Sequence, residues 1–477
     1  MKISMVASES NPLIKTGGLA DVVYSLSKEL VTMKNEVMVI MPLYKKIVDQ
    51  KTYKFNKIDS FNVRMSWRNN KANIYYVLID GISFYLVDNA YYFGRDGIYG
   101  FDDDMERFAF FTLAASIFLA KQETKPDIIH IHDWHPGMLA CLIRENEKYQ
   151  KLFAKTKIVF SIHNPAFQGM MADGDLANFY NLPHSLYENG KVRFSWGVST
   201  LKTAIIYADK ITTVSPTHRY ELLTKEGSMG LDSVLTLREC DFIGILNGID
   251  YQEFNPLHDE HINFPYSSVN FFRTKTENKW ELFKILGIQD LGQPLYSFVS
   301  RVTWQKGMDL VFPIIDELAS RGCNIIMLGS GEARYEDEMR RLQNKYPRNV
   351  ASYIGYNDDL AHKIYASSDY FFMPSLFEPC GLGQMIAQRY GTLPIVRFTG
   401  GLKDSVIGYD GTNVEKANGF GFFNFNYDSF KDAVMLSYDV YTNLPVRKQL
   451  VKNAMKVDNS WSRSAKDYLS LYRYIVE

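Results

Sequence analysis

Short apolar runs alternate with amphipathic stretches along most of the chain, a pattern typical of α/β proteins with parallel sheets. Lys2–Ala7 is predicted to be the first strand, and the run EVMVIMP at Glu36–Pro42 is predicted to be a second, buried one. Between them, five apolar residues recur at helical spacing: Leu19, Val22, Val23, Leu26 and Leu30. Together these segments predict one strand–helix–strand unit.

Two series of such elements follow one another along the chain. The first series is expected to contain further strands at 127–132, 157–163 and 210–214. The second is expected to contain strands at 295–300, 324–329, 351–355, 370–374 and 393–396, with helices at 308–320 and 332–345. Because no internal period relates the two series, they predict two Rossmann-like domains rather than a tandem repeat.

Two segments interrupt this scheme. Residues 53–88 are expected to form shorter antiparallel strands, because Asn69-Asn70 and Asp80-Gly81 are turn signals. Residues 165–195 are rich in Gly, Asn and aromatic residues and are expected to be irregular. A long loop of this kind in a compact domain is often functional.

The domain organisation follows from the position of the two series. The join is expected near 245–260, where Asn247-Gly248-Ile249-Asp250 precedes a polar stretch. We predict an N-terminal domain at 1–245, a C-terminal domain at 246–456 and a final helix at 457–477. The predicted fold class is α/β, with two Rossmann-like domains facing each other across a deep cleft, since ligands of open α/β sheets bind at the carboxyl ends of the strands.

The composition restricts the possible functions. Of 477 residues, 46% are hydrophobic and 22% are charged, as in an ordinary soluble globular protein. With 53 Lys and Arg against 54 Asp and Glu, the net charge is −1, so nucleic acid is not an expected partner. The 4 cysteines are widely scattered, which argues against a disulfide scaffold or a cysteine zinc site and suits a reducing cytosol.

Neither export nor a membrane partner is expected. The apolar stretch within residues 1–7 is too short for a signal peptide. Residues 108–120 are apolar apart from Thr112 and Ser116, but about 20 residues are needed to span a bilayer. This segment therefore predicts a buried core helix, and the protein is expected to be cytoplasmic.

The connection between the first strand and the first helix contains a glycine pair, in the segment Lys15-Thr16-Gly17-Gly18-Leu19-Ala20-Asp21. Two glycines allow backbone N–H groups to approach a ligand closely, and a helix N-terminus favours an anion. The segment is neither a G-x-G-x-x-G motif nor a P-loop, so a plain strand–helix turn is the alternative to phosphate binding.

Histidines gather at the ends of two predicted strands, in the segments 130–135 and 161–164. Four histidines suggest a metal site, but no H-E-x-x-H helix is present, and Asp133 lies beyond the face shared by His130 and His132. We therefore expect no metal, and some of these histidines are expected to be structural.

Two further loops between a strand and a helix carry candidate chemistry. The first, at 300–307, contains Arg301 and Lys306, which together suit a diphosphate; the alternative is an exposed basic loop. The second, at 374–384, contains Glu378, the only acidic residue between Met373 and Lys403. An isolated carboxylate among Pro, Phe, Cys and Gly is an unusual helix cap, which favours a ligand role.

Six motifs occur in the order and spacing of one known family. They are KTGGLADV at 15–22, HDWH at 132–135, HNPAFQG at 163–169, ILNGID at 245–250, SRVTWQKG at 300–307 and FEPCGL at 377–382. Together they resemble bacterial glycogen synthases and plant starch synthases, glucosyltransferases of the GT-B fold. The resemblance covers nearly the entire chain and implies that the final helix crosses back to the N-terminal domain.

The resemblance also implies a reaction and its site residues. The expected reaction transfers glucose from ADP-glucose to the non-reducing end of an α-1,4-glucan such as glycogen or a maltooligosaccharide, with retention of configuration and without a cofactor. Catalytic roles fall to Glu378, Arg301, Lys306 and His163. Donor binding falls to Lys15, Gly17, Gly18, Asp21, Asn247, Tyr356, Cys380, Gly381, Leu382 and Gly383. Contact with the sugar or acceptor falls to Asp133, Asn164 and Gln168.

The sequence departs from the family pattern at three positions within these motifs or next to them. Gly383 stands where the family usually has Thr, which puts a phosphate contact in doubt, and Pro165 and Phe167 replace the commoner Leu and Tyr in the expected acceptor loop. The absence of an additional carbohydrate-binding module or transit peptide disfavours a plastid form.

Several alternatives remain open at the level of sequence. The residues alone do not decide between ADP-glucose and UDP-glucose, and they leave the oligomeric state open. A phosphorylase, a nucleotide-sugar epimerase and a non-catalytic glucan-binding relative are the rival classes. The first resembles a different and longer chain, and Glu378, Arg301 and Lys306 together argue against the last.

Overall fold

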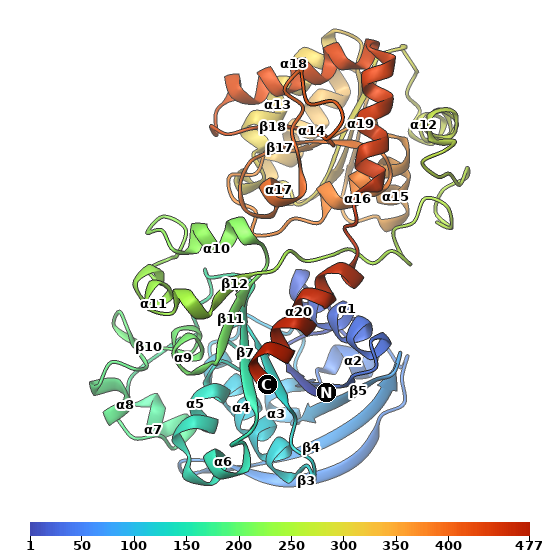
Figure 1. Cartoon of the computed structure of the whole chain (residues 1–477). Coiled ribbons are helices and arrows are strands. Elements are labelled where there is room, and N and C mark those ends of the chain that lie inside the picture. Colours follow the sequence, from blue (N-terminus) through green and yellow to red (C-terminus); the bar gives the residue numbers. More distant parts are fainter. The chain divides into compact units, whose positions relative to one another are not determined.

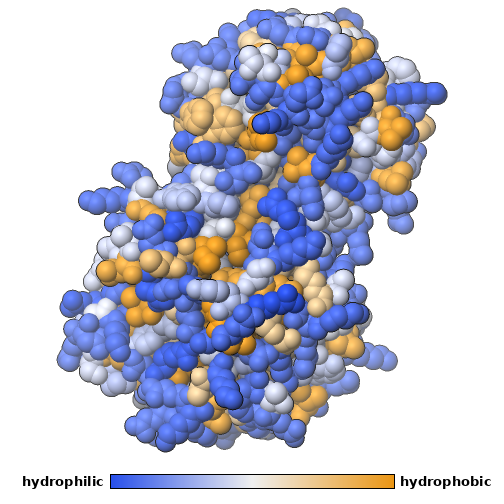
Figure 2. Space-filling model, viewed as in Figure 1, coloured by the Kyte–Doolittle hydropathy of each residue, from blue (hydrophilic) through white to orange (hydrophobic).

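The computed structural model describes all 477 residues and divides into two compact units (Figure 1). The first unit comprises Met1–Ile245 and Ser464–Glu477, and the second comprises Leu246–Arg463. None of the helices combines the length and hydrophobicity that a membrane span requires. On the face shown in Figure 2, hydrophilic residues cover most of the surface, and hydrophobic residues are exposed in small patches.

The first unit is built on a nine-stranded sheet in the order β12-β11-β7-β6-β1-β2-β5-β4-β3. Pairing is parallel from β12 to β5 and antiparallel from β5 to β3. The strands are β1 (Lys2–Val6), β2 (Glu36–Pro42), β3 (Asn56–Met65), β4 (Arg68–Ile79), β5 (Ile82–Asp88), β6 (Ile128–His132), β7 (Lys157–Ile162), β11 (Lys210–Thr213) and β12 (Phe242–Gly244). The predicted parallel series and the antiparallel pairing within 53–88 are confirmed, but the expectation of shorter strands there is wrong, since β3 and β4 contain 10 and 12 residues.

One predicted turn is wrong. Asn69-Asn70 lies inside β4, and the β3–β4 turn falls at Ser66-Trp67 instead, where Ser66 has a φ of 54°. The side chain of Asn181 stabilises this turn, since it accepts a hydrogen bond from Ser66 N at 2.9 Å and donates one to Arg64 O at 2.9 Å. A contact from so distant a residue overrides the local turn signal.

The segment 165–195 is more ordered than the sequence suggests. It contains α7 (Asp175–Tyr180), α8 (Ser185–Glu188), β8 (Met170–Met171) and β9 (Arg193–Phe194), and β10 (Gly197–Ser199) joins the two strands into a small antiparallel sheet. The expectation of an irregular loop is therefore wrong. These elements are too short for the sequence to show a periodic pattern.

Helices complete the first unit. They are α1 (Gly18–Thr32), α2 (Lys45–Asp49), α3 (Ala90–Phe93), α4 (Asp104–Lys121), α5 (Met138–Glu145), α6 (Glu147–Leu152), α9 (Thr200–Tyr207), α10 (Pro216–Leu222), α11 (Asp232–Leu237) and α20 (Trp461–Val476). Most of α4 is buried, as predicted for residues 108–120. From Ser464 onward α20 belongs to the first unit, where the hydroxyl of Tyr472 lies 2.7 Å from Nδ1 of His130.

The second unit contains a six-stranded parallel sheet in the order β15-β14-β13-β16-β17-β18. Its strands are β13 (Leu295–Val299), β14 (Asn324–Gly329), β15 (Val350–Ile354), β16 (Tyr370–Met373), β17 (Leu393–Arg397) and β18 (Phe420–Phe422). Its helices are α12 (Phe271–Leu286), α13 (Met308–Ser320), α14 (Ala333–Lys345), α15 (Asp358–Ser367), α16 (Gly383–Arg389), α17 (Gly400–Ser405), α18 (Tyr427–Thr442) and α19 (Leu444–Lys456). Each unit is thus a Rossmann-like α/β domain, and the loops after β13 and β16 lie side by side because these strands are neighbours.

Candidate functional site

The glycine loop of the first unit leads into α1. Both Gly17 and Gly18 are exposed, and a Cβ atom added to either would meet nothing within 4 Å. The backbone of Gly17 is extended, with a φ of −156°, so its conformation does not require glycine either. Packing within the unit therefore does not explain the two glycines, whereas close approach of a ligand would.

Lys15 and Asp21, on either side of the two glycines, form an ion pair. The Nζ atom of Lys15 lies 2.7 Å from Oδ2 of Asp21, and Asn11 donates a hydrogen bond to the other carboxylate oxygen at 2.5 Å. Burial raises the pKa of Asp21, and the charge of Lys15 opposes this rise. Asp21 therefore orients Lys15, whose side chain is 51% exposed.

Glu9 is a buried carboxylate next to the glycine loop that the sequence analysis did not single out. One of its carboxylate oxygens accepts hydrogen bonds from Thr16 N at 2.7 Å and Thr16 Oγ1 at 2.9 Å. Burial raises the pKa of Glu9 to about 7. The only sequence signal was its position shortly after the first strand, which ends at Val6.

Asp133 and His163 form the second part of the site in this unit. Asp133 follows β6 with a φ of 57°, and its Oδ1 accepts a hydrogen bond from His163 N at 2.8 Å. Burial raises the pKa of Asp133 to about 7 and lowers that of His163 to about 4. His163 is therefore a neutral imidazole at pH 7, with its Nε2 3.0 Å from Nδ1 of His132.

Other residues predicted in this region have structural contacts. His130 is fully buried between Tyr472 and Ser161, at 2.7 Å from each hydroxyl, which confirms that some of the histidines are structural. Gln168 donates a hydrogen bond to Pro165 O at 2.8 Å within its own loop. Asn164 is exposed, and its side-chain oxygen accepts a hydrogen bond from Ala166 N at 3.0 Å.

In the second unit, the loops after β13 and β16 bring Lys306 and Glu378 together. Lys306 Nζ lies 2.5 Å from Glu378 Oε2, which also accepts a hydrogen bond from Ser375 Oγ at 3.0 Å. The two charged side chains are only 16% and 11% exposed. No hydrogen bond within the protein uses the other carboxylate oxygen of Glu378. This oxygen can therefore accept a hydrogen bond from a ligand.

Gly307 makes this approach of the two loops possible. Its φ is 77°, and a Cβ atom there would lie 2.3 Å from the carbonyl oxygen of Pro374. Two hydrogen bonds join the loops on either side of this contact: Leu376 N donates to Gln305 O at 2.8 Å, and Gln305 Nε2 donates to Phe377 O at 2.7 Å. The two sequence motifs, at 300–307 and 374–384, are thus joined into one surface, here called the platform.

Arg301 differs from Lys306 in its surroundings. It is exposed, and its guanidinium group forms no ion pair. Trp304 and Phe377 lie on the same two loops with exposed fractions of 49% and 44% and a centroid separation of 6.4 Å. The sequence analysis did not single out this aromatic pair, because its exposure is visible only in the structure.

The start of α16 forms the remaining part of the platform. Leu382 precedes the helix and forms no side-chain cap, so the first backbone N–H groups are left for another acceptor. A Cβ atom on Gly383 would lie 3.0 Å from the ring of Phe371 and 3.3 Å from Met373 Sδ. These two side chains account for glycine at the position where the family usually has Thr.

The other predicted donor-binding residues are more scattered. Gly381 has a φ of 73°, and burial raises the pKa of the Cys380 thiol to about 12, so this thiol is not a nucleophile. Asn247 is buried, and its side-chain oxygen has no hydrogen-bond partner. Tyr356 is 86% exposed, and its hydroxyl donates a hydrogen bond to Asp358 at 3.1 Å.

Groups with the spacing of metal ligands lie elsewhere in the chain. One group contains Asp259 and His261 with His362, and the other contains Glu253 and Asp358 with His362. Neither group includes a predicted catalytic residue. The expectation that the reaction needs no metal therefore stays a prediction.

Comparison with known proteins identifies the family. Residues 2–237 match the starch synthase catalytic domain family, and residues 278–457 match glycosyl transferases group 1. A glycogen synthase of Clostridium kluyveri is 45% identical over 478 residues, which covers 100% of each chain. The chain belongs to the glycogen and starch synthase family. A glycogen synthase of Clostridium beijerinckii is 44% identical and covers 99% of each chain.

Membership of the glycogen and starch synthase family confirms the resemblance seen in the sequence, and it makes the chain a glucosyltransferase that elongates a glucan. The catalytic domain of Starch Synthase IV from Arabidopsis thaliana, solved with bound ADP and acarbose, is 33% identical with a TM-score of 0.90. It covers 100% of this chain and 99% of its own. The predicted α/β fold class of the GT-B type is thereby confirmed.

Proposed function

We propose that the chain transfers glucose from ADP-glucose to the non-reducing end of an α-1,4-glucan, with retention of configuration, and so elongates glycogen. The observation that carries this proposal is the platform of the second unit, where Lys306 and Glu378 form an ion pair and the same loop carries the exposed, unpaired Arg301. The Starch Synthase IV domain, with bound ADP and acarbose, supports the same substrate classes for this chain.

The platform suits departure of a diphosphate. Breaking the bond between glucose and phosphate places negative charge on the leaving group. Arg301 and Lys306 supply two cations to stabilise that charge, and the uncapped start of α16 supplies backbone N–H groups. Because Lys306 is largely buried and fixed by Glu378, it needs little reorganisation during the reaction.

Glu378 is assigned to the transferred glucose. A retaining glycosidase uses two carboxylates about 5–5.5 Å apart, one of which is a nucleophile. The Lys306–Glu378 cluster contains one carboxylate, which favours substitution on one face of the sugar without a covalent enzyme intermediate. The free carboxylate oxygen of Glu378 is assigned to the transferred glucose, where it stabilises the developing positive charge.

The residues of the first unit are assigned to the sugar and to the incoming glucan. Neutral His163, held through its backbone N–H by Asp133, can donate or accept a hydrogen bond with a sugar hydroxyl at pH 7. The exposed Asn164 and Phe167 lie in the same loop and suit an acceptor sugar.

ADP-glucose is expected to be the preferred donor by a clear margin in kcat/KM. The reason is the match of the whole chain to glycogen synthases and the exposed ring of Tyr356, which is assigned to the nucleobase. Nucleotide release is measured with ADP-glucose and UDP-glucose, each with and without glycogen. Equal or better turnover with UDP-glucose would contradict the ADP-glucose assignment, whereas binding of glycogen without nucleotide release would indicate a non-catalytic relative.

Chelation of divalent metals is expected to leave the initial rate essentially unchanged. The diphosphate has Arg301 and Lys306 as cationic partners, so it needs no metal for charge balance. The test is dialysis against EDTA followed by rate measurement with and without added Mg²⁺ or Mn²⁺. Complete loss of activity that either metal restores would show that the leaving group is stabilised in another way.

A further inference from the structure

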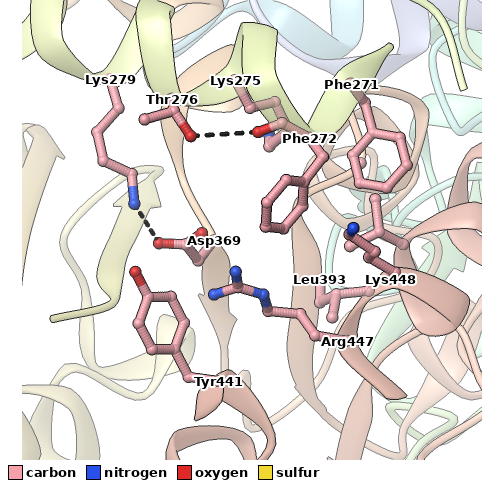
Figure 3. Close-up of a pocket in the computed structure, with 12 residues that line it drawn as sticks. Phe271, Phe272, Lys275, Thr276, Lys279, Asp369, Leu393, Tyr441, Arg447 and Lys448 are labelled. Atoms are coloured by element: carbon pink, nitrogen blue, oxygen red, sulfur yellow. Dashed lines mark hydrogen bonds and ion pairs between the residues drawn. The ribbon is translucent and has the colours of Figure 1, made fainter. Parts of the chain in front are cut away.

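A polar cavity lies in the second unit, away from the platform. It has a volume of about 60 Å³ and is lined by α12, α18, α19 and the residues next to β16 and β17 (Figure 3). Asp369 and Leu393 lie at the amino ends of these two strands, whereas Glu378 follows the carboxyl end of β16. The cavity and the platform are therefore at opposite edges of the sheet.

The cavity carries an excess of positive charge. Its lining contains the cations Lys275, Lys279, Arg447 and Lys448 but a single carboxylate, that of Asp369. This carboxylate is already committed, because its Oδ2 lies 2.5 Å from Lys279 Nζ and accepts a hydrogen bond from Leu295 N at 2.9 Å. Lys275, Arg447 and Lys448 form no ion pair with it, so this single carboxylate only partly balances the positive charge of the lining.

Lys275 is a buried amine without an ion-pair partner. Its Nζ is buried and donates hydrogen bonds to neutral acceptors only, among them Tyr390 O at 2.9 Å and Thr392 Oγ1 at 2.9 Å. Burial lowers the pKa of Lys275 to about 7. A bound anion next to this amine would favour its protonated form.

Arg447 and Lys448 are the other two cations of the lining. Neither forms an ion pair with a carboxylate; instead Arg447 lies over the ring of Tyr441 at 4.2 Å, and Lys448 lies over Phe272 at 4.4 Å. Figure 3 shows the guanidinium group of Arg447 pointing into the cavity toward Asp369. Both side chains are half-buried, so their charges are held in place and only partly solvated.

We propose that this cavity binds a phosphate group, with Arg447 and Lys448 as the principal donors. A guanidinium group recognises two oxygens of a tetrahedral oxyanion, and an ammonium group adds a point charge. A volume of about 60 Å³ is several times the roughly 10–15 Å³ that one water molecule needs, and it suits a single oxyanion. The phosphate is either free inorganic phosphate or the end of a small phosphomonoester whose remainder contacts Phe272, which is 37% exposed.

The test uses the full chain and inorganic phosphate as the probe. Thermal unfolding and calorimetric titration are compared with sodium chloride at matched ionic strength. Phosphate is expected to raise the melting temperature of the wild type, and the double variant Arg447→Gln/Lys448→Gln is expected to bind it roughly tenfold or more weakly, since it loses the charge-assisted hydrogen bonds. Lys452→Gln, an exposed position on the same helix, is the matched control.

Two further variants separate this site from the platform. Arg301→Ala is expected to retain the phosphate response, so a response lost in Arg301→Ala and kept in the double variant would assign phosphate to the platform and overturn the proposal. Lys448→Gln alone covers the case in which the double variant fails to fold. A wild-type response to phosphate that is no larger than the response to sodium chloride would also overturn the proposal.

Glycerol 3-phosphate distinguishes the two possible ligands. Tighter binding than inorganic phosphate indicates a phosphomonoester, and equal binding indicates the free anion.

Discussion

Replacing Glu378 with Gln is expected to lower kcat by about 10²–10³-fold, with a smaller change in the KM for the donor. Gln has nearly the same size and still accepts a hydrogen bond from Ser375, but it lacks the negative charge. That charge fixes Lys306 at 2.5 Å and is assigned to the positive charge that develops on the sugar. Initial rates of nucleotide release and the melting temperature are measured in one buffer.

Two variants serve as controls for Glu378→Gln. Glu415→Gln removes an exposed carboxylate in the same unit and is expected to leave kcat unchanged. Ser375→Ala removes one hydrogen bond at 3.0 Å but keeps the charge, so its loss of kcat is expected to be much smaller. If Glu378 only caps a helix, Glu378→Gln will retain near-normal turnover with a modestly lower melting temperature, and the catalytic assignment will be withdrawn.

The regular parts of the fold could be predicted from the sequence because burial leaves a clear pattern. A parallel strand covered on both faces is a continuous apolar run, and the predicted bounds of β2 (Glu36–Pro42) and β14 (Asn324–Gly329) agree with the structure. The bounds of α13 (Met308–Ser320) were predicted as well. Here the local pattern and the tertiary environment give the same result.

The errors occur where a distant contact decides the local structure. Asn69-Asn70 forms part of β4 because the turn is held at Ser66 by Asn181, which lies 115 residues away in the sequence. The strands β12 and β18 contain 3 residues each, too few for an alternating pattern to be detected. Sequence periodicity therefore predicts the long elements but not the short ones that complete each sheet.

The candidate site also contains some features that the sequence predicts and others that depend on distant contacts. Its motifs could be found because each follows a predicted strand, and the adjacency of β13 and β16 places two of them together. The ion pair of Lys306 with Glu378 joins residues 72 positions apart and depends on Gly307 passing the carbonyl group of Pro374. Glu9 was missed because its role is to hold Thr16, a contact that no spacing rule predicts.

Removing either cation of the platform is expected to lower kcat by about 10²–10³-fold, because each stabilises negative charge on the leaving diphosphate. The KM for the donor is expected to rise in both variants, since the diphosphate is also charged in the ground state. The two cations nevertheless differ in their environment: Arg301 is exposed and unpaired, whereas the Lys306 side chain is 16% exposed and paired with Glu378. Their effects on stability are therefore expected to differ.

Lys306→Ala leaves the carboxylate of Glu378, 11% exposed, without its cation, which is expected to cost roughly 3 kcal/mol of the free energy of unfolding. Arg301 is exposed and Arg301→Ala breaks no ion pair, so its melting temperature is expected to equal that of the wild type. The double variant Lys306→Ala/Glu378→Gln removes the unpaired charge and is expected to regain part of the lost stability without regaining turnover. Thermal unfolding, denaturant unfolding and kcat are measured for all three variants. Equal melting temperatures for Lys306→Ala and Arg301→Ala would show that the ion pair does not stabilise the platform, and near-normal kcat in Arg301→Ala would remove Arg301 from the catalytic residues.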